Sequence, residues 1–147
     1  MFNEIGILEH LSRTMFERVM PEGMTVAQFG ILNHFVRLGG ERSPARLAAA
    51  FQVTKPTMTS TLQRLERAGL VAIRPDPRDG RAKVVAITER GVAMRRACIE
   101  ALEPVLAQLG ALVPAGDFEA LLPGLTRLRQ TLDAERERFG TPRADAP

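Results

Sequence analysis

Residues 43–87, SPARLAAAFQVTKPTMTSTLQRLERAGLVAIRPDPRDGRAKVVAI, decide the fold of this chain. Ser43 with Pro44, and Thr54 with Pro56, are typical helix starts: a hydroxyl can cap the first turn, and proline sits where backbone N–H groups have no intrahelical partner. Gly69 supplies the stop of the second helix. Two short runs rich in Val and Ile then bracket a polar loop. The stretch predicts helices over 45–51 and 55–68, a tight turn between them, and a hairpin with strands 71–74 and 83–87.

Apolar residues at three- and four-residue spacings predict four more helices around this stretch. They cover 3–20, 25–38 with a capping box from Thr25 and Gln28, 88–110, and a last helix from residue 117 to about 138. Pro104 should kink or loosen the third of these helices, and Pro123 with Gly124 should break the first turns of the last.

The predicted fold class is mostly α with a small β-hairpin wing. It is a winged helix-turn-helix at about 25–90, flanked by N- and C-terminal dimerisation helices at about 3–20 and 88–138. With 147 residues and 45% hydrophobic composition, we expect a single domain over 1–139, followed by a flexible tail over 140–147.

Basic residues are concentrated in the middle of the chain. The net charge is only +3, but residues 42–96 hold 12 basic and 4 acidic side chains, while the segments on either side are net acidic. A basic block between acidic ends is typical of a module that binds a polyanion. On charge alone, a solvated cationic surface is an equally good interpretation.

Cysteine content and hydropathy bear on the compartment. The lone cysteine, Cys98, cannot form an intrachain disulfide. The N-terminus shows no basic-then-apolar leader, and no run reaches the roughly 18 apolar residues of a membrane span. We therefore expect a cytoplasmic protein without a membrane partner.

The predicted helix 55–68 has two chemically different faces. Met58, Leu62 and Leu65 share one face and should pack inward. This turns outward a second set, Pro56, Thr57, Ser60, Gln63, Arg64 and Arg67, and leaves Thr61 at the border. Short hydroxyl side chains let a helix enter a major groove deeply and bond base edges or phosphates. An ordinary surface helix is the alternative, but it would normally carry strong helix formers such as Glu and Lys.

The hairpin tip, residues 75–81, alternates arginines with aspartates between two prolines. Arg81, held by Asp79, could enter a narrow minor groove, and Arg78 could do the same or contact a phosphate. A salt-bridged surface turn is an equally good interpretation of the tip alone. The predicted DNA-contacting set is Ser43, Lys55, Pro56, Thr57, Ser60, Thr61, Arg64, Arg78, Asp79 and Arg81.

Three motifs in this region resemble the multiple antibiotic resistance regulator (MarR) family. They are the hydrophobic-Gly-Leu-Val exit at 65–71, Asp-Pro-Arg-Asp-x-Arg at 76–81, and Ile-Thr-Glu-x-Gly at 87–91. The resemblance implies a homodimeric transcriptional regulator, a ligand-responsive repressor, with interlocked terminal helices and two winged modules on double-stranded DNA with a pseudo-palindromic operator. It also implies that Asp79 orients Arg81, and that a small phenolic or lipophilic effector can bind between the dimerisation helices and the winged modules. Gly80 departs from the family pattern, in which arginine is frequent, so one wing contact is expected to be missing.

Dimerisation also has a basis in the residues themselves. Phe118, Leu121, Leu125, Leu128 and Leu132 follow a 3-4-3-4 spacing, and the first helix carries its own apolar stripe. Together they exceed what one small winged module can cover. Packing of these stripes within the same chain is the alternative.

Enzyme function has little support. His10 and His34 are the only histidines, and no HExxH, CxxC, phosphate-loop or GxSxG motif occurs. We therefore expect no catalysis, no metal and no cofactor; the rivals are a winged-helix protein-interaction module without DNA binding and a small hydrolase. His10 and His34 could meet near an effector site, although a half-buried histidine is the commoner case. Cys98 is predicted to be a packed small hydrophobe and not a redox sensor.

Overall fold

The structure is a computed structural model, and it describes residues 1–135. The chain divides into two compact units, with the boundary between Val105 and Leu106. In chain order the elements are α1 (Phe2–Glu17), a 3-10 turn (Pro21–Gly23), α2 (Val26–Leu38), α3 (Pro44–Ala50), α4 (Lys55–Arg67), β1 (Val71–Pro75), β2 (Lys83–Ile87), α5 (Glu89–Leu112) and α6 (Ala115–Ala134). The mostly α class with one β-hairpin is confirmed. A single domain over 1–139 stays a prediction, and the predicted tail 140–147 lies outside the described residues.

The predicted helix caps are present. Thr25 and Gln28 form the capping box, with the Thr25 N–H donating to Gln28 Oε1 at 2.9 Å and the Gln28 N–H donating to Thr25 Oγ1 at 3.2 Å. Ser43 accepts the Arg46 N–H at 3.2 Å, and Thr54 accepts the Thr57 N–H at 3.3 Å. Helices α2, α3 and α4 therefore begin where the sequence predicts, because each start has its own local hydrogen-bond partner.

The first helix ends earlier than its apolar spacing predicts, at Glu17 and not near Met20. The Glu17 carboxylate accepts the Val26 N–H at 3.0 Å, so the end of α1 helps to cap the start of α2. Met20, which the periodic pattern would leave in the helix, is instead buried in the core beyond it. The hydrogen bond between α1 and α2 therefore accompanies an end of α1 that the apolar spacing of α1 alone does not predict.

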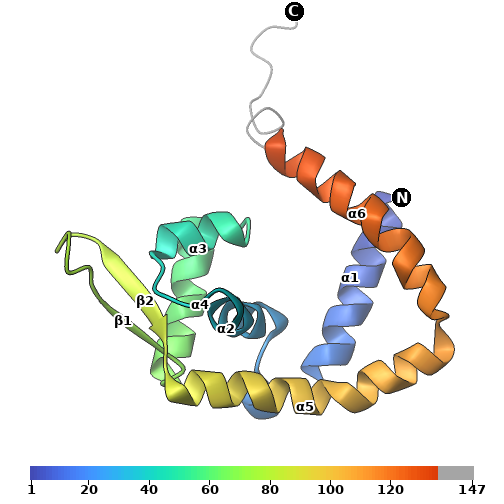
Figure 1. The fold of residues 1–147 in the computed structure, drawn as a ribbon, viewed down its shortest axis with the longest axis horizontal. Coiled ribbons are helices and arrows are strands. Elements are labelled where there is room, and N and C mark those ends of the chain that lie inside the picture. The colour runs from blue at the N-terminus through green and yellow to red at the C-terminus, as the bar shows by residue number, and fades with distance from the viewer. Residues whose placement is uncertain (136–147) are drawn as a thin grey trace, which may run out of the picture. The chain divides into compact units, whose positions relative to one another are not determined.

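The wing is an antiparallel hairpin with Val71 opposite Ile87 and Pro75 opposite Lys83. A single bridge adds Arg42 to its inner edge: the Arg42 N–H donates to the Val85 carbonyl at 3.1 Å, and the Val85 N–H donates to the Arg42 carbonyl at 2.8 Å. The segment before α3 is therefore hydrogen-bonded to the middle of β2. The hairpin itself extends beyond the neighbouring helices (Figure 1).

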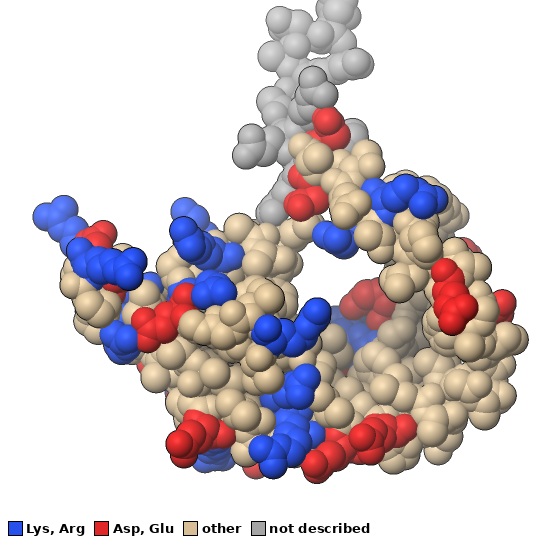
Figure 2. Space-filling view, viewed as in Figure 1, with Lys and Arg blue, Asp and Glu red and all other residues tan. Residues whose placement is uncertain are grey.

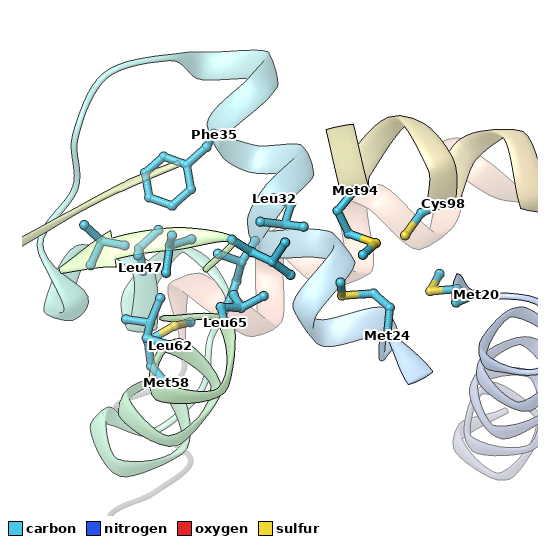
Figure 3. Packing of buried hydrophobic residues seen from close by; sticks show 14 of the residues in the cluster. Met20, Met24, Leu32, Phe35, Leu47, Met58, Leu62, Leu65, Met94 and Cys98 are labelled. Atoms are coloured by element: carbon cyan, nitrogen blue, oxygen red, sulfur yellow. The ribbon is translucent and has the colours of Figure 1, made fainter. Parts of the chain in front are cut away.

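One hydrophobic core holds the first unit together. Figure 3 shows Leu32 and Phe35 from α2 meeting Leu62 and Leu65 from α4, with Met94 from α5 close by. Each of these five side chains is buried. Since α2, α4 and α5 share this core, the orientation of α4 follows from packing and not from its own sequence alone.

The second unit was partly mispredicted. Pro123 and Gly124 do not break α6, which is continuous from Ala115 to Ala134. The proline ring fixes a φ value that a helix accepts, and its missing N–H removes one intrahelical hydrogen bond. Pro104 lies in the first unit, where helix α5 continues through it and on to Leu112, and a kink at Pro104 stays a prediction.

Within residues 1–135, no single helix has the length and apolar composition needed to cross a membrane. Only the bent pair α5 and α6, taken together, meets those two conditions.

Candidate nucleic-acid interface

Helix α4 separates its side chains as its sequence predicts. Met58, Leu62 and Leu65 are at most 2% exposed. The opposite face is exposed at Pro56, Thr57, Ser60, Gln63, Arg64 and Arg67, and Thr61 has intermediate exposure. Three buried anchors thus hold a helix whose polar face points to solvent.

Hydroxyl groups near the start of α4 differ in what they can still bind. Thr57 Oγ1 lies 2.8 Å from Thr54 Oγ1, and Thr61 Oγ1 donates to the Thr57 carbonyl at 3.0 Å. Within the described part of the chain, the Ser60 hydroxyl has no hydrogen-bond partner, nor do the side chains of Lys55 and Arg64. Ser60, Lys55 and Arg64 therefore keep uncommitted donors, as do Gln63 and Arg67 on the same face.

The wing tip is shaped by its aspartates in a way that the sequence did not predict. Asp79 Oδ1 accepts the backbone N–H of Arg81 at 3.0 Å, and Asp76 Oδ1 accepts that of Arg78 at 2.9 Å. Over residues 1–135, neither guanidinium group lies within ion-pair distance of a carboxylate. The interpretation of the tip as a salt-bridged turn is therefore wrong: the carboxylates bond the loop backbone and leave both arginine heads unpaired.

The wing carries, near the tip end of β1, an ion pair that sequence reasoning missed. Arg74 of β1 pairs with Glu41, which precedes α3, and the same segment forms the Arg42–Val85 bridge. The two partners are 33 residues apart, and no local pattern connects them. The basic block at 42–96 contains Arg74 and so indicates a charged surface in this region. It does not identify Glu41 as the partner of Arg74.

Basic side chains gather over the wing and α3 in Figure 2, with acidic groups among them. A polar hollow of about 540 Å³ lies there, lined by residues 41–43 and Arg46 on one side, and by residues 76–78 and Val84 on the other. A second hollow of about 460 Å³ lies between α4 and the wing, with Thr59, Leu62 and Gln63 along one wall. Of the predicted set, Ser43 and Arg78 line the first hollow together, whereas the predicted residues of α4 line neither hollow. Their contact with DNA stays a prediction.

The remaining candidate residues lie apart from this surface. The His34 ring lies 5.5 Å from that of Phe51 and lines a hollow of about 370 Å³ with Asn33 and Arg37. Burial, and then the charge of Arg42, lower the pKa of His34. His10 is exposed on α1 and does not line this hollow, so the structure does not bring the two histidines together there.

Cys98 is fully buried in the core, and burial raises the pKa of its thiol, as expected of a packed small hydrophobe. Among the described residues, no group of three or more His, Cys, Asp or Glu side chains could hold a metal ion.

Comparison with known proteins connects this geometry to a family. The profile of the MarR family matches residues 22–82, which run from the 3-10 turn to the wing tip. The transcriptional activatory protein BadR of Rhodopseudomonas palustris is 34% identical over 83 residues. That match covers 55% of this chain and 47%, about half, of BadR.

Solved structures extend the likeness in fold over most of the chain. The transcriptional regulator BldR from Sulfolobus solfataricus is 26% identical, with a TM-score of 0.76, over 88% of this chain and 92% of BldR. A mutant of MarR from E. coli in complex with operator DNA is 23% identical, with a TM-score of 0.76, over 86% of this chain and 91% of that one. Other proteins of this fold were solved with DNA or with a small-molecule ligand. Over residues 22–82 the chain therefore matches the model of the MarR family, and its fold is shared with solved transcriptional regulators, one of them in complex with operator DNA.

Proposed function

We propose that this protein is a cytoplasmic homodimer that binds pseudo-palindromic operators in double-stranded DNA sequence-specifically and acts as a ligand-responsive repressor. One observation carries the proposal: α4 exposes a small, hydroxyl-rich polar face directly opposite its three buried anchors. Such a face fits the major groove of B-DNA, which is wide enough to admit a helix.

Each part of the predicted set has a distinct role in this proposal. Thr57, Ser60 and Thr61 approach base edges and thymine methyl groups, while Arg64 forms a bidentate contact with guanine or contacts a phosphate. Lys55, Pro56 and Ser43 lie against the sugar-phosphate backbone. Arg81 enters the minor groove, with Asp79 fixing the loop backbone that carries it.

Exposed apolar side chains support the homodimer. No described residue of α1 or α6 is buried. On α1, Leu8 and Leu11 are each 58% exposed, and on α6 Leu121 and Leu122 are 58% and 65% exposed. An amphipathic helix with no buried residue gains little from folding alone, so a second copy of this chain is the partner we propose for both helices.

Ligand response rests on the family and not on an identified site. In the proposal, a phenolic or lipophilic compound binds between the dimerisation helices and the winged modules, and it favours one separation of the two α4 helices over another. A dimer reads two half-sites one helical turn apart, about 34–36 Å, so a change in that separation weakens operator binding.

The test is fluorescence anisotropy with duplex DNA from the region upstream of the protein's own gene. We expect binding that weakens steeply as salt increases. We expect Arg64→Ala to cost about 1–3 kcal/mol of binding free energy and to relax sequence preference at one base pair. Arg96→Ala, an exposed arginine of α5 outside the predicted contacts, is the matched control.

Failure of the wild-type chain to bind any duplex would favour the other interpretation of the fold, a winged-helix module that contacts only proteins. Unchanged binding by both Arg64→Ala and Arg81→Ala would show that the two arginines do not read the grooves. Adding candidate phenolic compounds to the same assay tests the ligand response separately.

A further inference from the structure

The hollow of about 540 Å³ between α3 and the wing has an unusual charge arrangement. Three arginines line it: Arg42 and Arg46 from the α3 side, and Arg78 from the wing. Arg46 and Arg78 are exposed, and Arg42 is half-buried. Two acidic residues, Glu41 and Asp76, also line it. What the hollow can bind depends on whether those carboxylates neutralise the arginines.

Both carboxylates of the lining already have bonding partners. Glu41 pairs with Arg74, which is not part of the lining, and Asp76 accepts the backbone N–H of Arg78 at 2.9 Å. Arg42 donates one N–H to the Glu41 carbonyl at 2.8 Å. Because Arg74 already neutralises Glu41, Asp76 is the one lining carboxylate that is not in an ion pair. The three arginines of the lining therefore leave a local excess of two positive charges.

Donor geometry favours an oxyanion over a neutral ligand. A guanidinium group presents five N–H donors in a plane that matches two oxygens of a phosphate, so each of the three arginines keeps donors to spare. Ser43 adds a further donor: its oxygen accepts the Arg46 N–H at 3.2 Å, and the hydroxyl proton remains to be donated outward.

We propose that this hollow is a phosphate clamp, in which Arg42, Arg46 and Arg78 bind one phosphodiester group of the DNA backbone. This rests on the proposed function. The clamp connects two elements that contact DNA differently, since Ser43 begins α3 and Arg78 belongs to the wing tip. A bound phosphodiester joins them and fixes the wing relative to α3. The same chemistry would suit a free phosphate, so the experiment has two arms.

The first arm measures the salt dependence of affinity for random-sequence duplex DNA. We expect Arg46→Ala, and separately Arg78→Ala, to lower affinity by a similar factor on every sequence. Each should reduce the slope of log K against log salt, and the double variant Arg46→Ala/Arg78→Ala should reduce it by about 1, the loss of the one phosphate contact that these arginines share. Arg96→Ala should leave the slope unchanged, and circular dichroism should show that all variants fold.

The second arm adds inorganic phosphate to the protein without DNA and measures Tm against sodium chloride of equal ionic strength. A reduced slope in the first arm, without a phosphate effect in the second, supports the clamp on DNA. If instead phosphate raises Tm in the wild-type chain but not in Arg46→Ala while the slope stays constant, the assignment to DNA is overturned.

Two further outcomes separate this inference from the proposed function. If the wild-type chain binds duplex DNA and both variants keep its slope, the clamp is wrong while the proposed function stands. If the wild-type chain binds no duplex DNA at all, the proposed function fails, and the clamp on DNA fails with it.

Discussion

Gly91 occupies the tightest glycine position in the described chain. A Cβ atom built there lies 2.1 Å from the Leu70 carbonyl oxygen and 2.7 Å from Ile87 Cγ1. The first of these is a backbone atom at the start of the wing and cannot rotate away. The first turn of α5 can approach the wing this closely only because residue 91 has no side chain.

We therefore expect Gly91→Ala to lower the free energy of unfolding by about 2–3 kcal/mol, even though alanine is the better helix former. Gly110→Ala is the matched control, because it lies in the same helix with nothing within 4 Å of its Cβ position. That variant should raise the free energy of unfolding by about 0.5–1 kcal/mol. Urea unfolding followed by circular dichroism measures both, and equal effects of the two substitutions would contradict the packing argument.

His34 should make stability depend on pH. Burial and Arg42 lower its pKa in the folded state below the ordinary value of 6.5. Between the two values, the unfolded state binds more protons than the folded state, so the free energy of unfolding rises with pH and falls as pH decreases through 6.5.

Urea unfolding of the wild-type chain and of His34→Gln at pH 8 and pH 5 measures this dependence. The wild-type chain should lose more free energy of unfolding than the variant as pH falls. Parallel behaviour of the two proteins would show that His34 does not contribute.

At the scale of elements, the junction between α4, the wing and α5 depends on one hydroxyl. Thr88 Oγ1 donates to the Gly69 carbonyl at 2.7 Å and accepts the Gly91 N–H at 3.0 Å. Gly69, with a φ of 68°, ends α4, and Gly91 lies in the first turn of α5. The side chain that caps α5 therefore also satisfies the turn after α4.

Replacing Thr88 with valine keeps the shape and removes both hydrogen bonds. We expect Thr88→Val to cost about 1–2 kcal/mol of stability and to speed hydrogen exchange at the Gly91 amide. Thr88→Ser retains the hydroxyl and should keep that amide protected. Loss of protection in the serine variant as well would assign the effect to the methyl group and not to the hydroxyl.

Local signals account for most of the elements that the sequence predicted. Helices α2, α3 and α4 have caps within three residues of their first turn, and the wing has strongly β-prone runs, so their bounds follow from nearby residues. The end of α1 does not, because Glu17 bonds an N–H nine residues away. The prediction that Pro123 breaks α6 rests on helix propensity alone. The helix of 20 residues instead continues through Pro123, with one backbone hydrogen bond fewer.

The candidate site divides in the same way. The inward and outward faces of α4 could be predicted because helical periodicity alone fixes them. Partners distant in sequence could not: the Glu41–Arg74 pair and the Arg42–Val85 bridge connect segments more than 30 residues apart. Asp76 and Asp79 stand close to arginines in the sequence, and this pattern favours ion pairs between their side chains. In the structure, each short carboxylate instead accepts the backbone N–H two residues further on, which it reaches more readily than it reaches a guanidinium group.

At the scale of the whole molecule, the proposed dimer predicts a change in mass. Replacing Leu8 and Leu11 together with asparagine should yield monomers at concentrations where the wild-type chain is dimeric, because each leucine loses apolar area at the proposed interface. Analytical ultracentrifugation measures this. His10→Asn, an exposed polar position on the same helix, is the control and should stay dimeric. A monomeric wild-type chain would overturn the proposed assembly.

The hydrogen bonds at the start of α5 also have a mechanical consequence. Thr88 attaches the first turn of α5 to the end of α4, and Arg95 donates two N–H groups to Asn33 of α2 at 3.1 and 3.0 Å. A helix of 24 residues is about 36 Å long, so a rotation of about 5° at this attachment displaces its other end by about 3 Å. Helix α5 is thus attached at its first turn, and a displacement of a few Å at its far end corresponds to a rotation of only a few degrees at this attachment.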